Sequence, residues 1–128
     1  MKKERKRLGD AELEIMQAVW AAGEPVSSAQ IQSALIGKRD WALATLMTSL
    51  SRLCDKGFLL CEKDGRNNRY SALIGEESYR QYEGKTMLEK LYGNSVTGLV
   101  ASLVDGHSVS EADLRDLRQL LDRWEESR

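Results

Sequence analysis

The sequence contains few of the residues on which enzymes and metal sites most often depend. Its 128 residues include one histidine, one proline and one phenylalanine, and its two cysteines form no CxxC pair. A single histidine argues against a histidine-based metal site or a Ser-His-Asp triad. No apolar run reaches the ~18 residues of a membrane span, and the charged start leads into no apolar signal segment. We therefore expect that the protein is not an enzyme and that it has no cofactor, no metal and no membrane partner. We also expect a cytoplasmic location with reduced thiols.

What the sequence does contain is typical of a helical globular protein, with 41% hydrophobic and 30% charged residues. The net charge of −1 hides an asymmetry between the two parts of the chain. Residues 1–75 carry 12 Lys and Arg against 9 Asp and Glu, a net of +3, whereas residues 76–128 carry 7 against 11, a net of −4. This pattern favours an anion-facing first part and a different task for the second.

Three helices are predicted in the first part of the chain, over about 11–22, 28–36 and 42–56. Asp10 is the expected N-cap of the first helix, and a Ser-x-x-Gln capping box at Ser27 begins the second. A glycine follows the third helix, as helix ends favour. The apolar stripe that turns the third helix toward the core is Leu43, Leu46, Leu50 and Leu53.

The periodicity then changes from helical to alternating. Residues 58–63 and 69–73 predict two short strands, and the loop 64–68 between them holds an Asp-Gly turn signal. Three helices followed by a hairpin is the order of a winged helix-turn-helix. The predicted fold class is therefore mainly α with a small β-hairpin wing, in a domain that covers residues 1–75.

Residues 76–128 predict three further amphipathic helices. They have too much apolar surface to remain alone, and the last one has the 3-4-3 spacing of a coiled-coil seam. We expect this domain to pair with a second copy as a homodimer. The alternative is that these helices fold back on the first domain. The expected dimerisation residues are Leu91, Leu99, Val100, Leu103, Leu114, Leu117, Leu121 and Trp124.

Nucleic-acid binding is the function that the helical order favours. In a helix-turn-helix, the second helix of the motif lies in the major groove of double-stranded DNA. The polar side chains expected there are Thr45, Thr48, Ser51 and Arg52. An arginine reads guanine, and a threonine methyl contacts thymine. The wing offers Lys63, Arg66 and Arg69 to phosphates, and the basic start of the chain forms an arm for the same purpose.

Two other interpretations stay open. The uncharged surface at Ala44 and Met47 also suits a winged-helix protein-interaction module that has lost DNA binding. Cys54 and Cys61 could form a redox pair, or they could be two reduced thiols. His107 is interpreted as an exposed loop residue rather than a catalytic group.

Several short segments, in order and at consistent spacing, together resemble one known family. They are Ala-Glu-Leu-Glu-Ile-Met at 11–16, Val19-Trp20, Asp40-Trp41, Thr45, Thr48, Leu-Ser-Arg-Leu at 50–53, Lys56-Gly57, the hairpin over 65–73, Leu99-Val100 and the Leu-rich last helix. From Leu8 to about Trp124 the chain resembles the penicillinase-repressor (BlaI/MecI/CopY) family of bacterial transcriptional regulators. The resemblance implies a winged-helix repressor that binds a palindromic operator as a homodimer, with β-lactam-resistance genes as one target class. Carried over by position, the reading residues are Ala44, Thr45, Met47, Thr48 and Arg52.

The chain departs from the family pattern in three places. Members usually have Ser-Pro-Lys-Thr after the tryptophan and a basic residue two positions further on, where this chain has Ala-Leu-Ala-Thr at 42–45 and then Met47. The Asn-Phe bond that is cleaved in penicillinase-type members is replaced by Val-Ala-Ser-Leu at 100–103. The C-terminal CxC pair of copper-responsive members is absent. The resemblance thus implies a different operator or weaker binding, and it leaves the release mechanism open.

Overall fold

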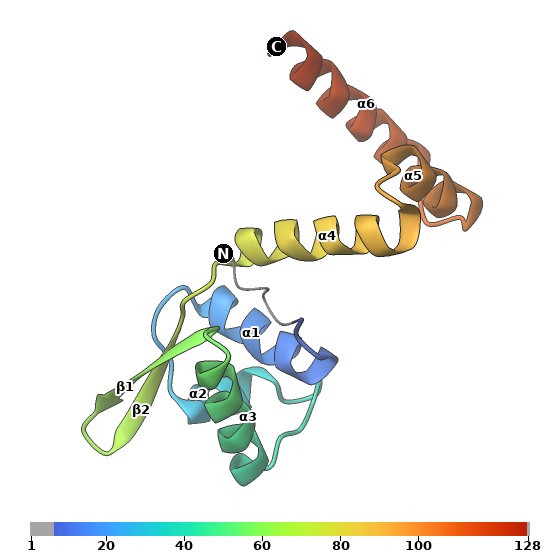
Figure 1. Cartoon of the computed structure of the whole chain (residues 1–128). Coiled ribbons are helices and arrows are strands. Elements are labelled where there is room, and N and C mark those ends of the chain that lie inside the picture. The colour runs from blue at the N-terminus through green and yellow to red at the C-terminus, as the bar shows by residue number, and fades with distance from the viewer. Residues whose placement is uncertain (1–6, 128) are drawn as a thin grey trace. The chain divides into compact units, whose positions relative to one another are not determined.

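The computed structural model describes residues 7–127, whose elements follow the predicted order (Figure 1). They are α1 (Asp10–Ala22), α2 (Ser28–Ala34), α3 (Leu43–Asp55), β1 (Leu59–Asp64), β2 (Asn67–Ala72), α4 (Glu76–Tyr92), α5 (Val96–Asp105) and α6 (Glu111–Glu126). A mainly helical chain with one antiparallel hairpin confirms the predicted fold class. Apart from Arg7, the expected N-terminal arm lies outside the described residues.

The chain forms two compact units, of which the first ends at Glu83 and the second begins at Gly84. The boundary between the units therefore lies inside α4. The division of function into residues 1–75 and 76–128 stays a prediction.

The core of the first unit is formed by apolar side chains from α1, α2, α3 and the hairpin. On α3, Leu46, Leu50 and Leu53 are fully buried at the spacing that the sequence predicts. Because the apolar stripe of α3 lies in this core, the opposite face of the helix is left to solvent. The other buried members are Leu8, Ile15, Met16, Val19, Val26, Ile31, Leu35, Phe58, Leu59, Tyr70 and Tyr79.

The prediction that Leu43 belongs to this core is wrong. Leu43 is the first residue of α3, and its side chain is 50% exposed. A helical wheel places it on the same side as Leu50, but the core does not extend to the first turn of the helix. Leu43 is therefore part of the surface of α3.

Side chains fix the starts of the first two helices. Ser27 Oγ accepts a hydrogen bond from Gln30 N at 3.2 Å, and Gln30 Oε1 accepts one from Ser27 N at 2.8 Å, which confirms the predicted capping box. In α1 the N-cap is Gly9, so the prediction of Asp10 as N-cap is wrong by one residue. The reason is that Glu12 Oε1 accepts a hydrogen bond from Gly9 N at 3.2 Å.

The hairpin is longer than predicted, and its loop is tighter. Its last residue pair is Asp64 with Asn67, so only Gly65 and Arg66 form the turn. Gly65 has a φ of +67° at the first of the two turn positions, a conformation that glycine adopts without strain. The turn therefore places the side chain of Arg66 at the tip of the wing.

Two backbone features attach the wing to the helices. Val26 N donates to Tyr70 O at 3.0 Å and Tyr70 N donates to Val26 O at 2.7 Å, which forms an antiparallel bridge between the α1–α2 connection and β2. Gly57, with a φ of +84°, turns the chain from α3 into β1. The wing is thereby held at both of its strands.

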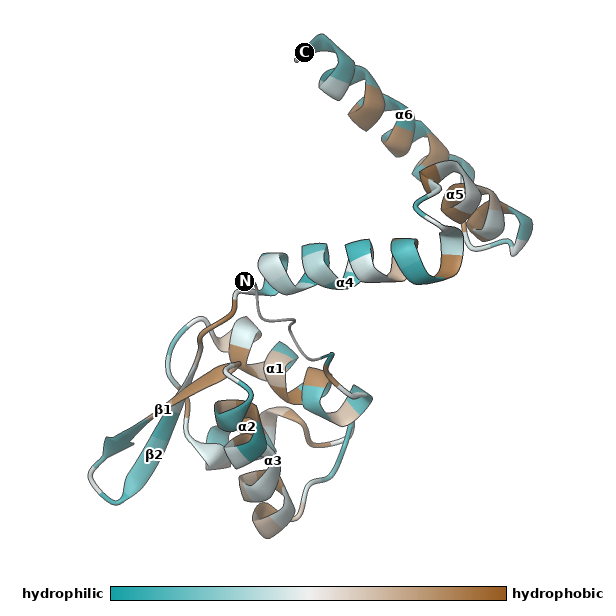
Figure 2. Cartoon of the chain, in the orientation of Figure 1, coloured by the Kyte–Doolittle hydropathy of each residue, from teal (hydrophilic) through white to brown (hydrophobic). Residues whose placement is uncertain are grey.

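The second unit contains helices with apolar residues but without buried ones. Ser110 Oγ accepts from Asp113 N at 3.0 Å, which confirms Ser110 as the cap of α6. Hydrogen bonds between the Asp113 carboxylate and the backbone and side chain of Ser110 lower the pKa of Asp113. No residue of α5 or α6 is buried, although Figure 2 shows hydrophobic residues along both helices. Within residues 7–127, no helix is both long and apolar enough to cross a membrane.

Candidate nucleic-acid interface

The face of α3 that points away from the core carries all the reading residues that the sequence predicts. Each of these side chains is exposed, and together they span about two turns of the helix. They are Ala44, Thr45, Met47, Thr48, Ser51 and Arg52. The structure thus brings the six predicted positions to one surface, which the buried leucines on the other side hold in place.

Hydrogen bonds in the α2–α3 turn set the start of this surface. Gln32 Nε2 donates to Trp41 O at 2.9 Å, and Gly37 N donates to Asp40 Oδ1 at 3.0 Å. The Trp41 ring packs against the core, and its Nε1 has no hydrogen-bond partner among the described residues. The turn is therefore fixed by side-chain bonds on both sides of the loop.

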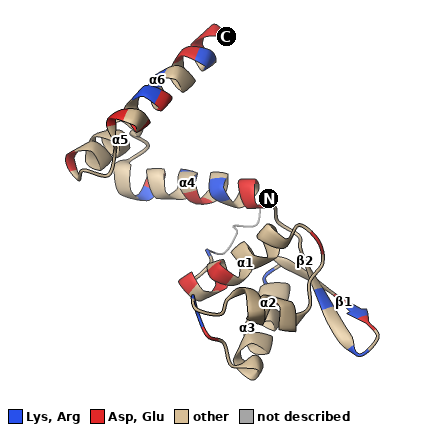
Figure 3. Ribbon diagram, turned by 180° about the vertical axis from the view of Figure 1, so that it is seen from behind, with Lys and Arg blue, Asp and Glu red and all other residues tan. Residues whose placement is uncertain are grey.

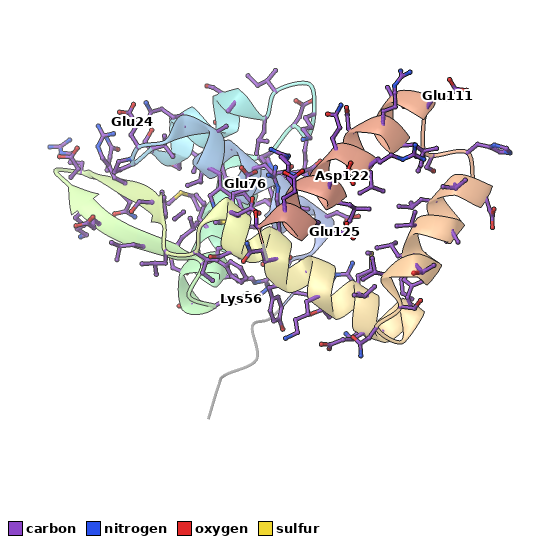
Figure 4. The ribbon with its side chains drawn as sticks, turned by 90° about the horizontal axis from the view of Figure 1, so that it is seen from above. Glu24, Lys56, Glu76, Glu111, Asp122 and Glu125 are labelled. Carbon is purple, nitrogen blue, oxygen red and sulfur yellow. The ribbon has the colours of Figure 1, made fainter. Side chains whose placement is uncertain are left out.

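Some basic residues around α3 form hydrogen bonds or ion pairs with side chains of α1, and the others do not. Lys56, labelled in Figure 4, donates to both carboxylate oxygens of Glu12 at 2.8–2.9 Å. Arg39 pairs with Glu14, and Lys38 Nζ lies 3.5 Å from Gln17 Oε1. These three cations are directed toward α1 rather than outward.

The ion pair between Glu12 and Lys56 is partly shielded from solvent. Burial by itself raises the pKa of Glu12, but the hydrogen bonds from Lys56 and Gly9 N outweigh it, together with the charges of Lys56 and Arg52. The resulting pKa lies below the usual value. The carboxylate is thus ionised at neutral pH and joins α1 to the end of α3.

Apart from Arg52 on α3, the available cations of this region lie on the wing. Lys63 on β1, Arg66 in the turn and Arg69 on β2 are all exposed. Arg69 Nε lies 2.7 Å from Asp64 Oδ2, whereas Lys63 and Arg66 form no ion pair with any residue in 7–127. Figure 3 shows these basic positions on the hairpin, while α3 is largely uncharged. The wing therefore supplies point charges suited to phosphate.

Sequence reasoning missed one residue of this surface. Leu43 is 50% exposed and precedes Met47 by four residues, a spacing that puts the two side chains next to each other on a helix. Met47 itself is 37% exposed. The signal in the sequence was the position of Leu43 at the helix start, before the first residue of the buried stripe.

The two thiols lie close to the junction between α3 and the wing. Cys54 is half-buried and packs against the core, and Cys61 is exposed on β1. Burial raises the pKa of the Cys54 thiol, and Cys61 and Asp55 raise it further. A protonated thiol is a poor nucleophile, so the chemistry favours the interpretation of two reduced thiols. No group of three His, Cys, Asp or Glu side chains within residues 7–127 could hold a metal.

The eight predicted dimerisation residues are exposed or only partly covered within one chain. None of them is buried, and Leu91 and Trp124 are 71% and 57% exposed. Leu114, Leu117, Leu121 and Trp124 keep the 3-4-3 spacing along α6. These positions stay a prediction for an interface, since the described chain is a single copy.

A cavity of about 310 Å³ lies in the first unit, between α1 and the first turns of α4. Its apolar lining includes Leu13, Trp20 and Tyr79. Of its charged lining, Arg80 pairs with Glu76 at 3.4 Å (Glu76 is labelled in Figure 4) and Arg7 pairs with Glu83 Oε2 at 3.3 Å, whereas Glu83 Oε1 is buried without a hydrogen-bond partner among the described residues. Trp20 Nε1 is also occupied, because it donates to Ile74 O at 2.9 Å. Among the described residues, the cavity therefore keeps one buried carboxylate oxygen, Glu83 Oε1, without a partner.

Three features together define a winged-helix DNA-binding protein. They are a buried helix-turn-helix core, the exposed face of α3 (the second helix of that motif) and a hairpin with free cations. The model of the penicillinase repressor family matches residues 8–123. The chain therefore belongs to the penicillinase repressor family, which confirms the resemblance found in the sequence. Members of this family are transcriptional repressors and not enzymes.

The chain is also similar to individual proteins. The chain is 36% identical over 111 residues to an uncharacterized 16.5 kDa protein of Latilactobacillus sakei, covering 87% of this chain and 75% of that one. It is 28% identical over 116 residues to the methicillin resistance regulatory protein MecI of Mammaliicoccus sciuri, covering 91% and 94%. It is 27% identical over 116 residues to the penicillinase repressor of Bacillus licheniformis, covering 91% and 90%.

Two solved structures share the fold of the first part of the chain. One is the DNA-binding domain of the repressor BlaI, with a TM-score of 0.52 and 32% identity over 61% of this chain and 94% of that one. The other is the monomeric form of Bacillus licheniformis BlaI in complex with the blaP half-operator, with a TM-score of 0.50 and the same identity and coverage. The second structure was solved with DNA bound to the relative.

Proposed function

We propose that this chain is a transcriptional repressor that binds a palindromic operator as a homodimer. The observation that carries the proposal is the exposed face of α3, held by buried leucines in a chain of the penicillinase repressor family. Genes of the resistance type, such as those for β-lactam resistance, are the target class that the family suggests. Because its ligand is chromosomal DNA, we place the protein in the cytoplasm.

In this proposal the contacts with bases and the contacts with phosphates come from different elements. The first domain, residues 1–75, places α3 in the major groove, where base edges are read. Lys63, Arg66 and Arg69 bind phosphates and fix the position of the protein on the duplex. Arg52, the one basic side chain of α3, reads guanine with its two-pronged guanidinium.

The second domain, residues 76–128, brings two copies together in the proposed dimer. Apolar side chains on α5 and α6 are not buried within the chain. A contact between two copies covers the same patch on both, and its two-fold symmetry matches that of a palindrome. A two-fold symmetric dimer is therefore the assembly that fits a palindromic operator.

Fluorescence anisotropy tests the DNA-binding proposal. DNA from upstream of the protein's own gene is titrated beside random DNA over a range of salt concentrations. We expect tighter binding to the upstream DNA and a steep decrease of affinity with salt. Arg52→Ala should cost about 1–3 kcal/mol of specific binding, whereas the control Arg80→Ala on α4 should cost none. Equal weak binding to both DNAs would contradict the proposal.

Sedimentation tests the dimer separately. Leu117→Asp puts a charge into the apolar seam of α6, so we expect a shift toward monomer. Gln119→Asp introduces the same charge at an exposed position of the same helix and should leave the dimer intact. A Leu117→Asp protein that still sediments as a dimer would exclude this seam as the interface.

One observation favours a second candidate, a winged-helix module that binds a protein. Leu43 and Met47 expose apolar side chains where a DNA-reading helix commonly carries charge. A pull-down that recovers one stoichiometric protein and no DNA would support this candidate. Specific binding in the anisotropy experiment would reject it.

A further inference from the structure

The first half of α3 presents hydrocarbon where base-reading helices usually present charged or amide groups. From Leu43 to Leu50 the helix has no charged residue and no amide side chain. Leu43 is 50% exposed and Met47 is 37% exposed, and Ala44 lies exposed beside them. Because residues three and four apart are neighbours on a helix, these side chains form one continuous patch. We call Leu43, Ala44 and Met47 the apolar patch.

Of the two exposed threonine hydroxyls next to this patch, that of Thr45 is open to solvent and that of Thr48 is already used within the helix. Thr48 Oγ1 donates to Ala44 O at 3.1 Å. The hydroxyl has a single hydrogen, so Thr48 keeps no donor for a base and offers only its oxygen lone pairs and its methyl group. Thr48, about one turn after the start of α3, therefore offers a base a further methyl group rather than a hydrogen-bond donor.

The major groove contains one apolar group that fits such a surface. Guanine, adenine and cytosine present only hydrogen-bonding groups there, whereas thymine also presents its C5-methyl. Placing the apolar patch against donors or acceptors leaves them without partners, which is unfavourable. Placing it against methyl groups removes apolar surface from water on both sides.

We propose that Leu43 and Met47 read thymine C5-methyl groups, so that each operator half-site carries thymines at the bases facing the first half of α3. The proposal rests on the proposed function, because it names the DNA sequence class that the same surface recognises. It assigns specificity to side chains that donate no hydrogen bond. Arg52, more than a turn further along α3, reads a different base in the same half-site.

The experiment begins by letting the full chain choose its own operator from a pool of random duplexes. In the selected duplex, each thymine of a half-site is then replaced singly by deoxyuridine, which lacks only the C5-methyl. One buried methyl-sized group corresponds to about a fourfold change in affinity. We therefore expect binding to weaken about fourfold at each contacted thymine, with no change at the others.

A matched pair of variants connects the effect to the residue. Met47→Ala should weaken binding to the thymine duplex and remove the effect of deoxyuridine at one position. Leu73→Ala truncates another exposed apolar side chain, which lies after β2 and outside α3, and should keep the full deoxyuridine effect.

The outcomes separate this proposal from the proposed function. Specific binding that is indifferent to every deoxyuridine, or a selected half-site without a common thymine, overturns the methyl reading and leaves the repressor intact. An unchanged deoxyuridine pattern in both Leu43→Ala and Met47→Ala also overturns it. If no duplex is selected over random DNA, the proposed function fails and the methyl reading fails with it.

Discussion

Leu46 and Met47 are consecutive residues of α3 with opposite environments, and truncating each to alanine tests the orientation of the helix. Leu46 is fully buried in the core, whereas Met47 is 37% exposed. Replacing a buried leucine by alanine removes apolar contacts and leaves a cavity, at a cost of about 2–5 kcal/mol. Truncating an exposed side chain changes stability by about 0.5 kcal/mol or less.

Thermal unfolding followed by far-UV circular dichroism measures this difference. A domain of this size loses roughly 4–8 °C in Tm for each kcal/mol. Leu46→Ala should therefore lower Tm by about 8–40 °C, and Met47→Ala by less than about 4 °C. All proteins are compared at one concentration, because dimer formation makes Tm depend on concentration.

DNA binding should change in the opposite order. At a temperature where both variants are folded, Leu46→Ala should keep the base preference of the unmodified chain, whereas Met47→Ala should alter it. A larger loss of Tm in Met47→Ala than in Leu46→Ala would refute the orientation of α3. Equal losses would refute it as well, since they would place the core midway between these two side chains, which lie about 100° apart on the helix, rather than behind Leu46.

Three further predictions concern the supports of this helix and the wing. Glu12→Gln should lower the free energy of unfolding by about 1 kcal/mol at pH 7, because it removes the charged partner of Lys56. Since the folded pKa of Glu12 lies below its ordinary value of 4.5, this difference should be present above that pH and disappear as pH falls through the folded pKa, as urea unfolding at several pH values will show. Gly57→Ala should cost about 1–2 kcal/mol in the same assay, because a φ of +84° strains any residue with a Cβ, and an unchanged midpoint would contradict this. Arg66→Gln should reduce the slope of log affinity against log salt by about 1 while leaving base preference intact, and a changed preference would place Arg66 in a groove instead.

Features set by neighbouring residues could be predicted from the sequence. The capping box from Ser27 to Gln30, the cap at Ser110 and the buried stripe of α3 depend on spacings of three or four residues, and the structure contains them. The hairpin followed from its alternating pattern and its Asp-Gly signal. The exposed face with Thr45, Thr48, Ser51 and Arg52 followed from the same helical spacing, whereas Met47 was carried over from the family resemblance.

Features that depend on residues far apart in the chain could not be predicted. The Glu12–Lys56 pair joins positions 44 residues apart, and no local pattern links them. The bridge between Val26 and Tyr70 likewise depends on how the hairpin meets the helices. The exposure of Leu43 depends on where the core ends, which a helical wheel does not contain.

The arrangement of charge around α3 supports a separation between affinity and specificity. Lys38, Arg39 and Lys56 are directed to partners on α1, so the helix-turn-helix itself presents little free positive charge. Apart from Arg52, the free cations lie on the wing, where they contact phosphates in the proposed complex, and their contribution to affinity falls as salt rises. Contacts between methyl groups release no counterions, so the deoxyuridine effect should be the same at low and high salt. Loss of that effect at high salt would mean that α3 reaches the bases only when the wing is bound.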